Sequence, residues 1–234
     1  YPQGEVAAHL IGFSNVDDVG QEGLELAFED WLRGVPGRRQ VMQDRRGRII
    51  EELNIIQTAR AGKRLELSID FRLQNLAYRE LKAEYITRRA KSATVVVLDV
   101  ATGEVLAMAN QPSYNPHNKV NMTDFSVLRN RAITDVFEPG STIKVFTIAA
   151  ALESGIYSVE TVIETSPGWM MVSGNTIRDI FNYGTLTVEK VITKSSNIGA
   201  SKIALEIGAE PIRDLLERVG FGQVTGTGFP EIGR

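Results

Sequence analysis

The chain holds 234 residues, of which 43% are hydrophobic and 24% are charged, so it has the composition of a globular protein with a sizeable core. Its formal net charge of −3 argues against a surface that binds nucleic acid, although Arg45, Arg46 and Arg48 form a local basic group. The sequence lacks cysteine, and its two histidines, His9 and His117, are too far apart for a zinc motif. We therefore expect no nucleic-acid partner, no disulfide, and neither a metal nor another cofactor.

The first part of the chain, residues 1–62, is charged and rich in glycine and proline, which interrupt regular structure. Within it, only Glu22 to Leu32 carries apolar residues at helical spacing. Longer patterned stretches begin after Gly62, so we place a domain boundary there. We predict that residues 1–62 form part of a small non-catalytic module and that residues 63–234 form a second domain.

The second domain opens with signals for strands and for one helix. Leu65 to Ile69 alternates like a strand, and Asp70 follows as the N-cap of a helix with apolar positions up to Tyr85. Ala93 to Val100 and Glu104 to Ala109 are strand-like and flank a Thr-Gly turn. These two segments predict an antiparallel hairpin that is buried on at least one face.

Helical signals dominate the rest of the second domain. Apolar periodicity and glycine stops predict helices at Ser141 to Ser154, Thr187 to Thr193, Ile198 to Ile207 and Ile212 to Val219. Strands come first along the chain and helices follow. This order indicates the α+β class, with helices packed on an antiparallel sheet, rather than alternating βαβ units.

Ser141 follows a Pro-Gly break at the start of the first of these helices and stands three residues before Lys144. Residues at this spacing share a helix face, so the lysine can lie beside the serine hydroxyl. A free lysine has a pKa of about 10.4, but burial would lower that pKa and let the neutral amine take the serine proton. Because this helix is apolar around most of its circumference, we predict that it is buried and that Ser141 and Lys144 form a nucleophile and its base.

The same segment allows simpler interpretations. A Ser-x-x-Lys pattern arises by chance about once in a chain of this size, and a serine after a break is a good helix N-cap. Glu138 could act as a general acid, but a carboxylate near a helix N-terminus more often balances the helix dipole. The free N–H groups at this terminus are suited to an oxyanion on a substrate carbonyl. The segment alone leaves catalysis and capping both open.

An acyl-transfer site of this kind needs further polar groups to relay a proton and to hold the substrate backbone. Ser-x-Asn could supply them, and it occurs at Ser113–Asn115, Ser173–Asn175 and Ser195–Asn197. The first two lie in turn-rich stretches, where serine and asparagine serve turn geometry. The third lies between two apolar helical segments, which favours a functional site, although helix capping explains it equally well.

Longer runs of the sequence resemble the class B penicillin-binding proteins, a family that carries Ser-x-x-Lys and a second motif of the Ser-x-Asn type. The resemblance covers nearly the whole chain and rests on residues 21–31, 44–48, 97–118, 129–144 and 182–199. It implies an α+β fold of the penicillin-binding and serine β-lactamase type. It also implies that residues 1–62 belong to a pedestal or dimerisation module.

Position by position, the resemblance implies that Ser141 is the acylated nucleophile and Lys144 its base. Ser195 and Asn197 would form the second motif and help to bind the substrate, and the backbone N–H of Ser141 would be one oxyanion donor. The implied activity is that of a peptidoglycan D,D-transpeptidase, which cross-links stem peptides ending in D-Ala-D-Ala during septal cell-wall synthesis. β-Lactam antibiotics would imitate that substrate.

The resemblance also implies a cellular setting. The chain would be the periplasmic domain of an inner-membrane protein whose membrane anchor is not in this sequence. Its partners would be division-machinery proteins, such as a glycan-polymerising partner. Two other functions stay open, namely a non-catalytic scaffold or binding fragment of the division machinery and a β-lactamase or penicillin sensor.

One motif of the family is missing from these residues. The family carries Lys-Thr-Gly or Lys-Ser-Gly on a strand after the second motif, where it binds the substrate carboxylate. The sequence has Lys91-Ser92-Ala93, which is wrong in residue and order, and Thr225 to Gly228, which has no lysine. We therefore expect a transpeptidase domain that is truncated before this motif and impaired alone. The most useful single observation is whether a Lys-Thr-Gly strand follows Arg234 in the parent gene.

Overall fold

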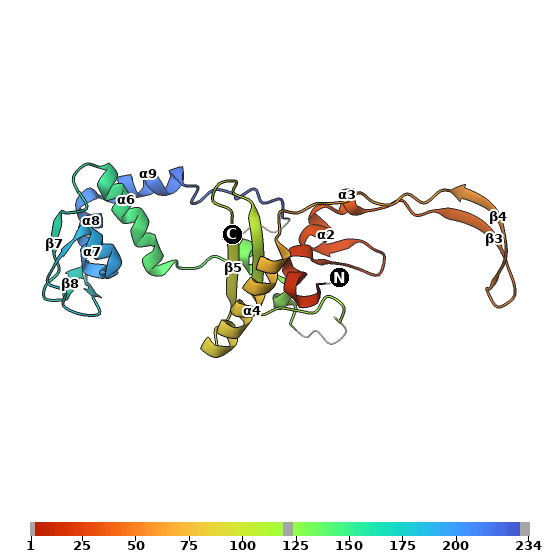
Figure 1. Cartoon of the computed structure of the whole chain (residues 1–234), viewed down its shortest axis with the longest axis horizontal. Helices are drawn as coiled ribbons and strands as arrows, with labels where there is room; N and C mark the ends of the chain where they lie inside the picture. The colour runs from red at the N-terminus through yellow and green to blue at the C-terminus, as the bar shows by residue number, and fades with distance from the viewer. Residues whose placement is uncertain (1–2, 119–123, 230–234) are drawn as a thin grey trace. The chain divides into compact units, whose positions relative to one another are not determined.

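The computed structural model describes residues 3–118 and 124–229 and has the predicted α+β composition. The chain forms two compact units, which we call unit 1 (Tyr1–Val136 and Gly226–Arg234) and unit 2 (Phe137–Thr225) (Figure 1). These units are defined by contacts in the fold, and the domain boundary at residue 62 stays a prediction. Within the described ranges, no helix is both long enough and apolar enough to cross a bilayer.

Unit 1 opens with short elements in place of the helix expected from Glu22 to Leu32. That helix is broken at Phe28, which has φ −116° and ψ 26°. The elements in chain order are η1 (Gly4–Ala7), α1 (Ala8–Ile11), β1 (Phe13–Ser14), β2 (Gly20–Glu22), α2 (Gly23–Ala27) and α3 (Glu29–Leu32). Ala8 and Phe13 pack with Tyr114 from a later segment, so this part shares a core with the rest of unit 1.

A two-stranded hairpin that the sequence did not predict follows α3. Strand β3 (Arg38–Gln43) pairs antiparallel with β4 (Ile49–Gln57), and Figure 1 shows the two as a long ribbon. Asp44 closes the turn, because its Oδ1 accepts from the backbone N–H of Arg46 at 2.8 Å and of Arg48 at 2.9 Å. Almost every residue of the hairpin is exposed, which explains why no alternation of apolar and polar residues marks it.

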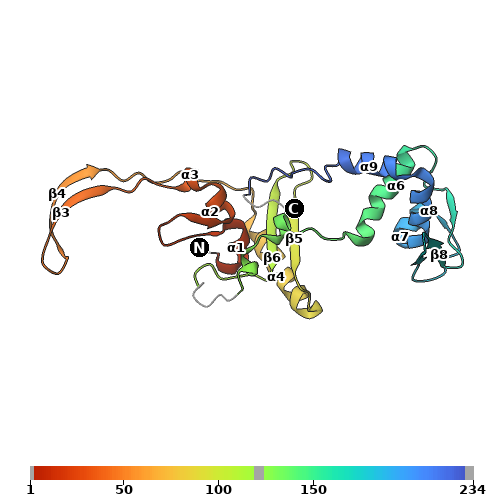
Figure 2. The same ribbon diagram turned by 180° about the vertical axis from the view of Figure 1, so that it is seen from behind.

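Helix α4 (Phe71–Arg88) packs against the hairpin of β5 (Ala93–Leu98) and β6 (Val105–Gln111), as the view from behind also shows (Figure 2). The predicted N-cap is confirmed, since the Asp70 carboxylate accepts from the backbone N–H groups of Arg72 and Leu73. The strand predicted for residues 65–69 is wrong. That segment is irregular and is held to β6 by single contacts, including the Ser68 hydroxyl that donates to the Val105 carbonyl at 2.7 Å.

Gln74 is a fully buried polar residue that joins three elements of unit 1. Its Nε2 donates to the carbonyls of Val6 at 2.7 Å and of Met108 at 2.8 Å, and its Oε1 accepts from the Met108 N–H at 2.8 Å. These bonds connect α4 to β6 and to the residues before α1. A buried polar side chain is tolerated only when it is hydrogen-bonded in this way.

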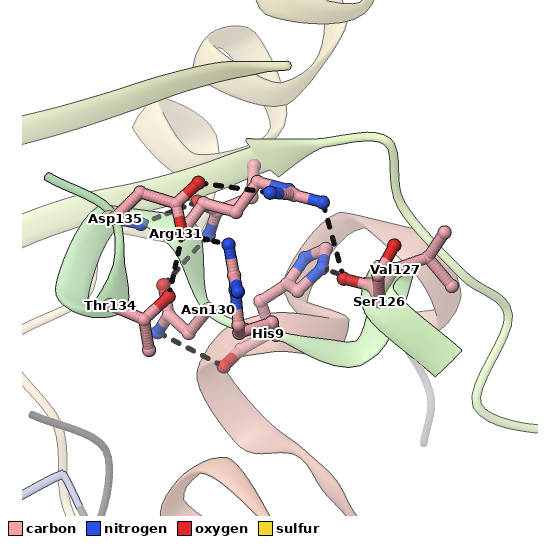
Figure 3. Close-up of polar contacts among 10 residues, drawn as sticks. His9, Ser126, Val127, Asn130, Arg131, Thr134 and Asp135 are labelled. Carbon is pink, nitrogen blue, oxygen red and sulfur yellow. Dashed lines mark hydrogen bonds and ion pairs between the residues drawn. The ribbon is translucent and has the colours of Figure 1, made fainter. Parts of the chain in front are cut away.

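A second polar cluster lies between α1, η2 (Phe125–Leu128) and α5 (Arg131–Thr134) (Figure 3). The buried Asn130 donates to the His9 carbonyl at 3.3 Å and accepts from the Asn110 amide at 2.9 Å. The His9 ring lies 2.7 Å from the Val127 carbonyl. These contacts tie the residues at the start of the chain to the segment that leads into unit 2.

Unit 2 is built around helices whose apolar faces meet in one core. Its elements are η3 (Gly140–Ile143), α6 (Lys144–Glu153), β7 (Val162–Glu164), β8 (Trp169–Val172), β9 (Asn175–Arg178), β10 (Thr185–Thr187), α7 (Val188–Thr193), α8 (Asn197–Ile207) and α9 (Ala209–Arg218). Ile148, Val191 and Ile203 are buried in that core and come from α6, α7 and α8. Burying one such side chain stabilises the fold by about 1.5–3 kcal/mol.

The helices predicted in this region are present with small differences at their ends. The predicted helix from Ser141 begins as the 3₁₀ turn η3 and becomes α-helical at Lys144. The prediction that this helix is buried all round is wrong for the described chain, because Val145 is 53% exposed and Leu152 is 36% exposed. Helix α6 therefore has one face in the core and one outside it.

We expect Gln74→Leu to destabilise unit 1 by about 2–4 kcal/mol, because it leaves buried carbonyl and N–H groups without partners. Hydrogen exchange of the Met108 amide in the complete protein should become faster, and urea should unfold unit 1 at a lower concentration. The same substitution at the exposed Gln57 of β4 is the matched control and should change neither quantity. An unchanged Met108 exchange rate in Gln74→Leu would contradict the structural role of Gln74.

Candidate active site

Ser141 stands in the 3₁₀ turn η3, directly after Gly140, whose φ of +62° suits glycine. The Thr142 hydroxyl donates to the Pro139 carbonyl at 2.6 Å, and the Lys144 N–H donates to the Ser141 carbonyl. A 3₁₀ turn has about three residues per turn, so residues three apart lie on one face. The turn therefore places the side chains of Ser141 and Lys144 on the same side, with Ser141 exposed.

Lys144 reaches across to the segment between α7 and α8. Its Nζ donates to the Ser195 carbonyl at 2.7 Å, to Ser195 Oγ at 3.2 Å and to Asn197 Oδ1 at 2.6 Å. The structure thus brings together three of the four residues that the sequence singled out. Among the described residues, no side-chain hydrogen bond joins Ser141 Oγ to Lys144 Nζ, so the predicted contact between these side chains is not made here.

The segment that receives Lys144 is a tight helix end. The N–H of Ser195 donates to the Ile192 carbonyl, and the N–H of Ser196 donates to the Val191 carbonyl, both at 2.9 Å. This is the hydrogen-bond pattern of a Schellman motif. Ser195 has φ +53°, in the left-handed region where glycine is the usual residue. A side chain held there costs about 1–3 kcal/mol. The strained position retains a serine whose hydroxyl and carbonyl both contact Lys144.

Asn197 is oriented by a second bond. Its Nδ2 donates to the Arg178 carbonyl at 2.8 Å, and its Oδ1 therefore faces the Lys144 ammonium. Gly199 lets this turn approach α7, because a Cβ at Gly199 would lie 2.6 Å from a methyl group of Val191. The polar turn is thus fixed by backbone bonds, an amide bond and close packing.

Asp179, which no sequence pattern indicated, lies beside the same turn. Its Oδ1 accepts from the N–H of Asn197 at 2.5 Å and of Ile198 at 3.1 Å, and its Oδ2 accepts from the Ser196 hydroxyl at 2.6 Å. Asp179 follows β9 and precedes the turn by many residues, so only the folded chain brings them together. No local spacing pattern could have identified it.

Burial lowers the pKa of Lys144 below the ordinary value of 10.5, while the charge of Asp179 acts in the opposite direction. The lysine borders a cleft of about 310 Å³ within unit 2. The other residues lining the cleft are Thr147, Ile177, Asn197, Ala200, Ser201 and Ala204. Their apolar atoms account for the partial desolvation of the ammonium group.

The hydrogen bonds of Lys144 set what the site can do chemically. An ammonium group has three donors, and here they match the three acceptors on Ser195 and Asn197. In this state the nitrogen has no lone pair to offer. After losing one proton, the amine keeps two donors for the turn and gains a lone pair that can accept the Ser141 proton.

Unit 1 holds a larger cavity that contains none of the predicted site residues. It measures about 530 Å³ and has a charged lining that includes Asp17, Asp18, Glu25, Arg33 and Arg60. We assign the chemistry to the smaller cleft, because it, and not the larger cavity, is lined by Lys144 and Asn197. Among the described residues, no group of three or more His, Asp or Glu side chains could hold a metal ion.

Comparison with known families gives two matches along the chain. Residues 93–232 match the Penicillin binding protein transpeptidase domain, and residues 1–67 match the Penicillin-binding Protein dimerisation domain. The chain is 48% identical over 229 residues to peptidoglycan D,D-transpeptidase FtsI of Escherichia coli K12, covering 98% of this chain and 38% of that protein. It is 45% identical over 230 residues to the probable peptidoglycan D,D-transpeptidase PbpC of Pseudomonas aeruginosa, covering 98% of this chain and 40% of that protein.

Solved structures give the same result. Penicillin binding protein 3 from Mycobacterium tuberculosis, in a complex with ampicillin, superposes with a TM-score of 0.82 at 30% identity, covering 100% of this chain and 48% of that one. A peptidoglycan glycosyltransferase from Burkholderia ambifaria superposes with a TM-score of 0.63 at 42% identity, covering 72% of this chain and 49% of that one. The resemblance stated from the sequence is confirmed, and the chain belongs to the class B penicillin-binding proteins.

Proposed function

We propose that the chain contributes the nucleophile, the base and the second motif of a peptidoglycan D,D-transpeptidase. The observation that carries the proposal is the contact of Lys144 Nζ with Ser195 and Asn197, in a cleft where burial lowers the lysine pKa. Structural helix capping explains Ser196, but it does not require a lysine from another helix. The relatives named as D,D-transpeptidases support the reaction type, and the chain spans about two fifths of their length.

In the acylation step, the neutral Lys144 amine accepts the proton from Ser141 Oγ. The oxygen then bonds to the carbonyl carbon of the penultimate D-Ala in a stem peptide that ends in D-Ala-D-Ala. The C–N bond to the last D-Ala breaks, and the leaving amine receives a proton from Lys144, relayed by the Ser195 hydroxyl. The N–H of Ser141 is one donor to the oxyanion formed during attack. The products are an ester on Ser141 and free D-Ala.

In the second step, an amine from a neighbouring stem peptide attacks the ester. Lys144 accepts a proton from that amine, the C–O bond to Ser141 breaks, and the serine oxygen takes a proton back. A new peptide bond joins the two stems, and the enzyme returns to its starting state. A β-lactam follows the first step only, because its leaving nitrogen stays tethered to the acyl group. The ampicillin complex of the M. tuberculosis protein supports this assignment.

We place the protein in the periplasm, attached to the inner membrane, with division-machinery proteins as partners. The support is the identity of 48% to FtsI of E. coli, a protein named as a peptidoglycan D,D-transpeptidase. The stem peptide and β-lactams are the proposed small ligands. A glycan-polymerising enzyme is the proposed partner class, because cross-linking requires newly made glycan strands.

We expect labelled penicillin to acylate the complete protein at Ser141, and we expect Ser141→Ala to abolish the label. The reason is that no other hydroxyl lies on the Lys144 face of the 3₁₀ turn. Ser173→Ala is the matched control, because Ser173 belongs to another Ser-x-Asn segment of unit 2 and is exposed. Mass spectrometry of the labelled peptide measures both the amount and the position.

Each result of this labelling experiment separates the candidate functions. Labelling that persists in Ser141→Ala would remove Ser141 from the reaction. A complete protein that takes up no label would favour a scaffold or binding function. Release of the penicilloyl group within seconds would indicate a β-lactamase, since a transpeptidase holds that adduct for much longer.

We expect the acylation rate to rise with pH as Lys144 loses its proton, with a midpoint below 10.5 because burial lowers its pKa. Lys144→Arg should reduce acylation at pH 8 by about 100-fold or more, because a guanidinium stays charged and cannot accept the proton. Lys190→Arg, on the exposed face of α7, is the control and should leave the rate unchanged. Equal rates for Lys144→Arg and the wild type would refute the role of Lys144 as a base.

A further inference from the structure

Asp179 contacts the turn before α8 through both oxygens of its carboxylate. One oxygen accepts from the backbone N–H groups of Asn197 and Ile198, at 2.5 Å and 3.1 Å, and the other accepts from the Ser196 hydroxyl at 2.6 Å. Hydrogen bonds to an ionised group are roughly twice as strong as neutral ones. The carboxylate therefore holds the turn by three charge-assisted bonds from outside the helix.

Ordinary helix capping does not account for this arrangement. Ser196 already caps α8, because its Oγ accepts from the Gly199 N–H at 2.9 Å. Asp179 adds a connection from the end of β9, which is a separate element. Beside it, the backbone carbonyl of Arg178 accepts from the Asn197 side chain at 2.8 Å. The end of β9 thus fixes both the backbone and the amide of Asn197, which contacts Lys144.

We propose that Asp179 is a positioning residue of the reaction, which holds Ser195 and Asn197 where they contact the Lys144 amine. It acts through the turn and does not touch the substrate, so it is not a catalytic residue. The inference rests on the proposed function and adds a residue outside both sequence motifs. A carboxylate is required, because an amide has one acceptor oxygen and the turn presents donors to two.

The charge of Asp179 provides a signature that a purely structural role would lack. It raises the pKa of Lys144 and so opposes the larger effect of burial. Helices α7 and α8, which pack on α6, also carry Glu189, Lys190, Lys202 and Glu206, and α9 carries further charged side chains. The causes of the Lys144 pKa shift are burial, which is the larger, and the charge of Asp179. Removing the Asp179 charge should therefore lower the Lys144 pKa further.

The test is the pH profile of acylation by labelled penicillin in the complete protein, for wild type and Asp179→Asn. We expect the rate at the high-pH plateau to fall about tenfold to a hundredfold, because one donor of the turn loses its acceptor. We also expect the rising part of the curve of acylation rate against pH, here called the limb, to move to lower pH. A variant that merely loosens the turn would move the limb to higher pH, because Lys144 would lose the burial that lowers its pKa.

Asp214→Asn is the matched control, since it removes the same charge from an exposed position on α9 in the same unit. We expect this variant to keep the wild-type acylation rate at high pH and the wild-type pH range over which that rate rises. An Asp179→Asn plateau equal to that of the wild type, or a limb displaced to higher pH, would overturn the proposal.

Ser196→Ala keeps the test decisive if Asp179→Asn does not fold. It removes one bond to Asp179 but keeps the charge, so we expect a lower plateau without a shift of the limb to lower pH. An unchanged plateau in Ser196→Ala would overturn the proposal in that case.

The NMR titration of ¹³C-labelled Lys144 separates this inference from the proposed function. If the wild type is not acylated, the proposed function fails, yet the titration still tests Asp179. A lower Lys144 pKa in Asp179→Asn supports the placement of the carboxylate, and an equal or higher pKa overturns it.

Discussion

The contact between the Lys144 ammonium and the turn before α8 is the interaction on which the candidate site depends. It joins a lysine at the start of α6 to Ser195 and Asn197, which are far along the chain. Ser195 makes this contact while its backbone holds the left-handed conformation that ends α7. A strained residue at a functional contact is retained only where surrounding structure fixes it.

The surrounding structure does fix it, through the core of unit 2. Ile148, Val191 and Ile203 bury the facing sides of α6, α7 and α8, so the helices that carry the site are held by common packing. Gly199 permits the first turn of α8 to approach α7, since any Cβ there would collide with Val191. The polar residues thus lie on or directly beside elements that share this core.

Local patterns predicted what depends on local physics. The cap at Asp70, the hairpin of β5 and β6, and the helices of unit 2 follow from capping, alternation and periodicity, and all are present. The hairpin of β3 and β4 was missed because its exposed strands show no alternation. The strand expected at residues 65–69 was wrong because an alternating pattern does not by itself supply a partner strand.

In the candidate site, too, local patterns predict one part and only the folded chain reveals the other. Ser141 and Lys144 are three residues apart, and Ser195 and Asn197 two apart, so short spacings reveal each pair. That the two pairs meet is a tertiary fact, which the sequence supplied only through resemblance to a family. Asp179 shows the limit most clearly, since its partners Ser196 and Asn197 lie in another element and no spacing rule connects them.

The charge state of Lys144 is then set by two opposing effects within one cleft. Burial favours the neutral amine, and the carboxylate of Asp179 favours the ammonium. In the free site, the ammonium has its full set of acceptors on Ser195 and Asn197, so it is a stable resting form. A substrate that covered this cleft, as the proposed function requires, would remove more water from Lys144. On the proposed function, desolvation by the substrate would therefore shift Lys144 toward the form that can accept a proton from Ser141.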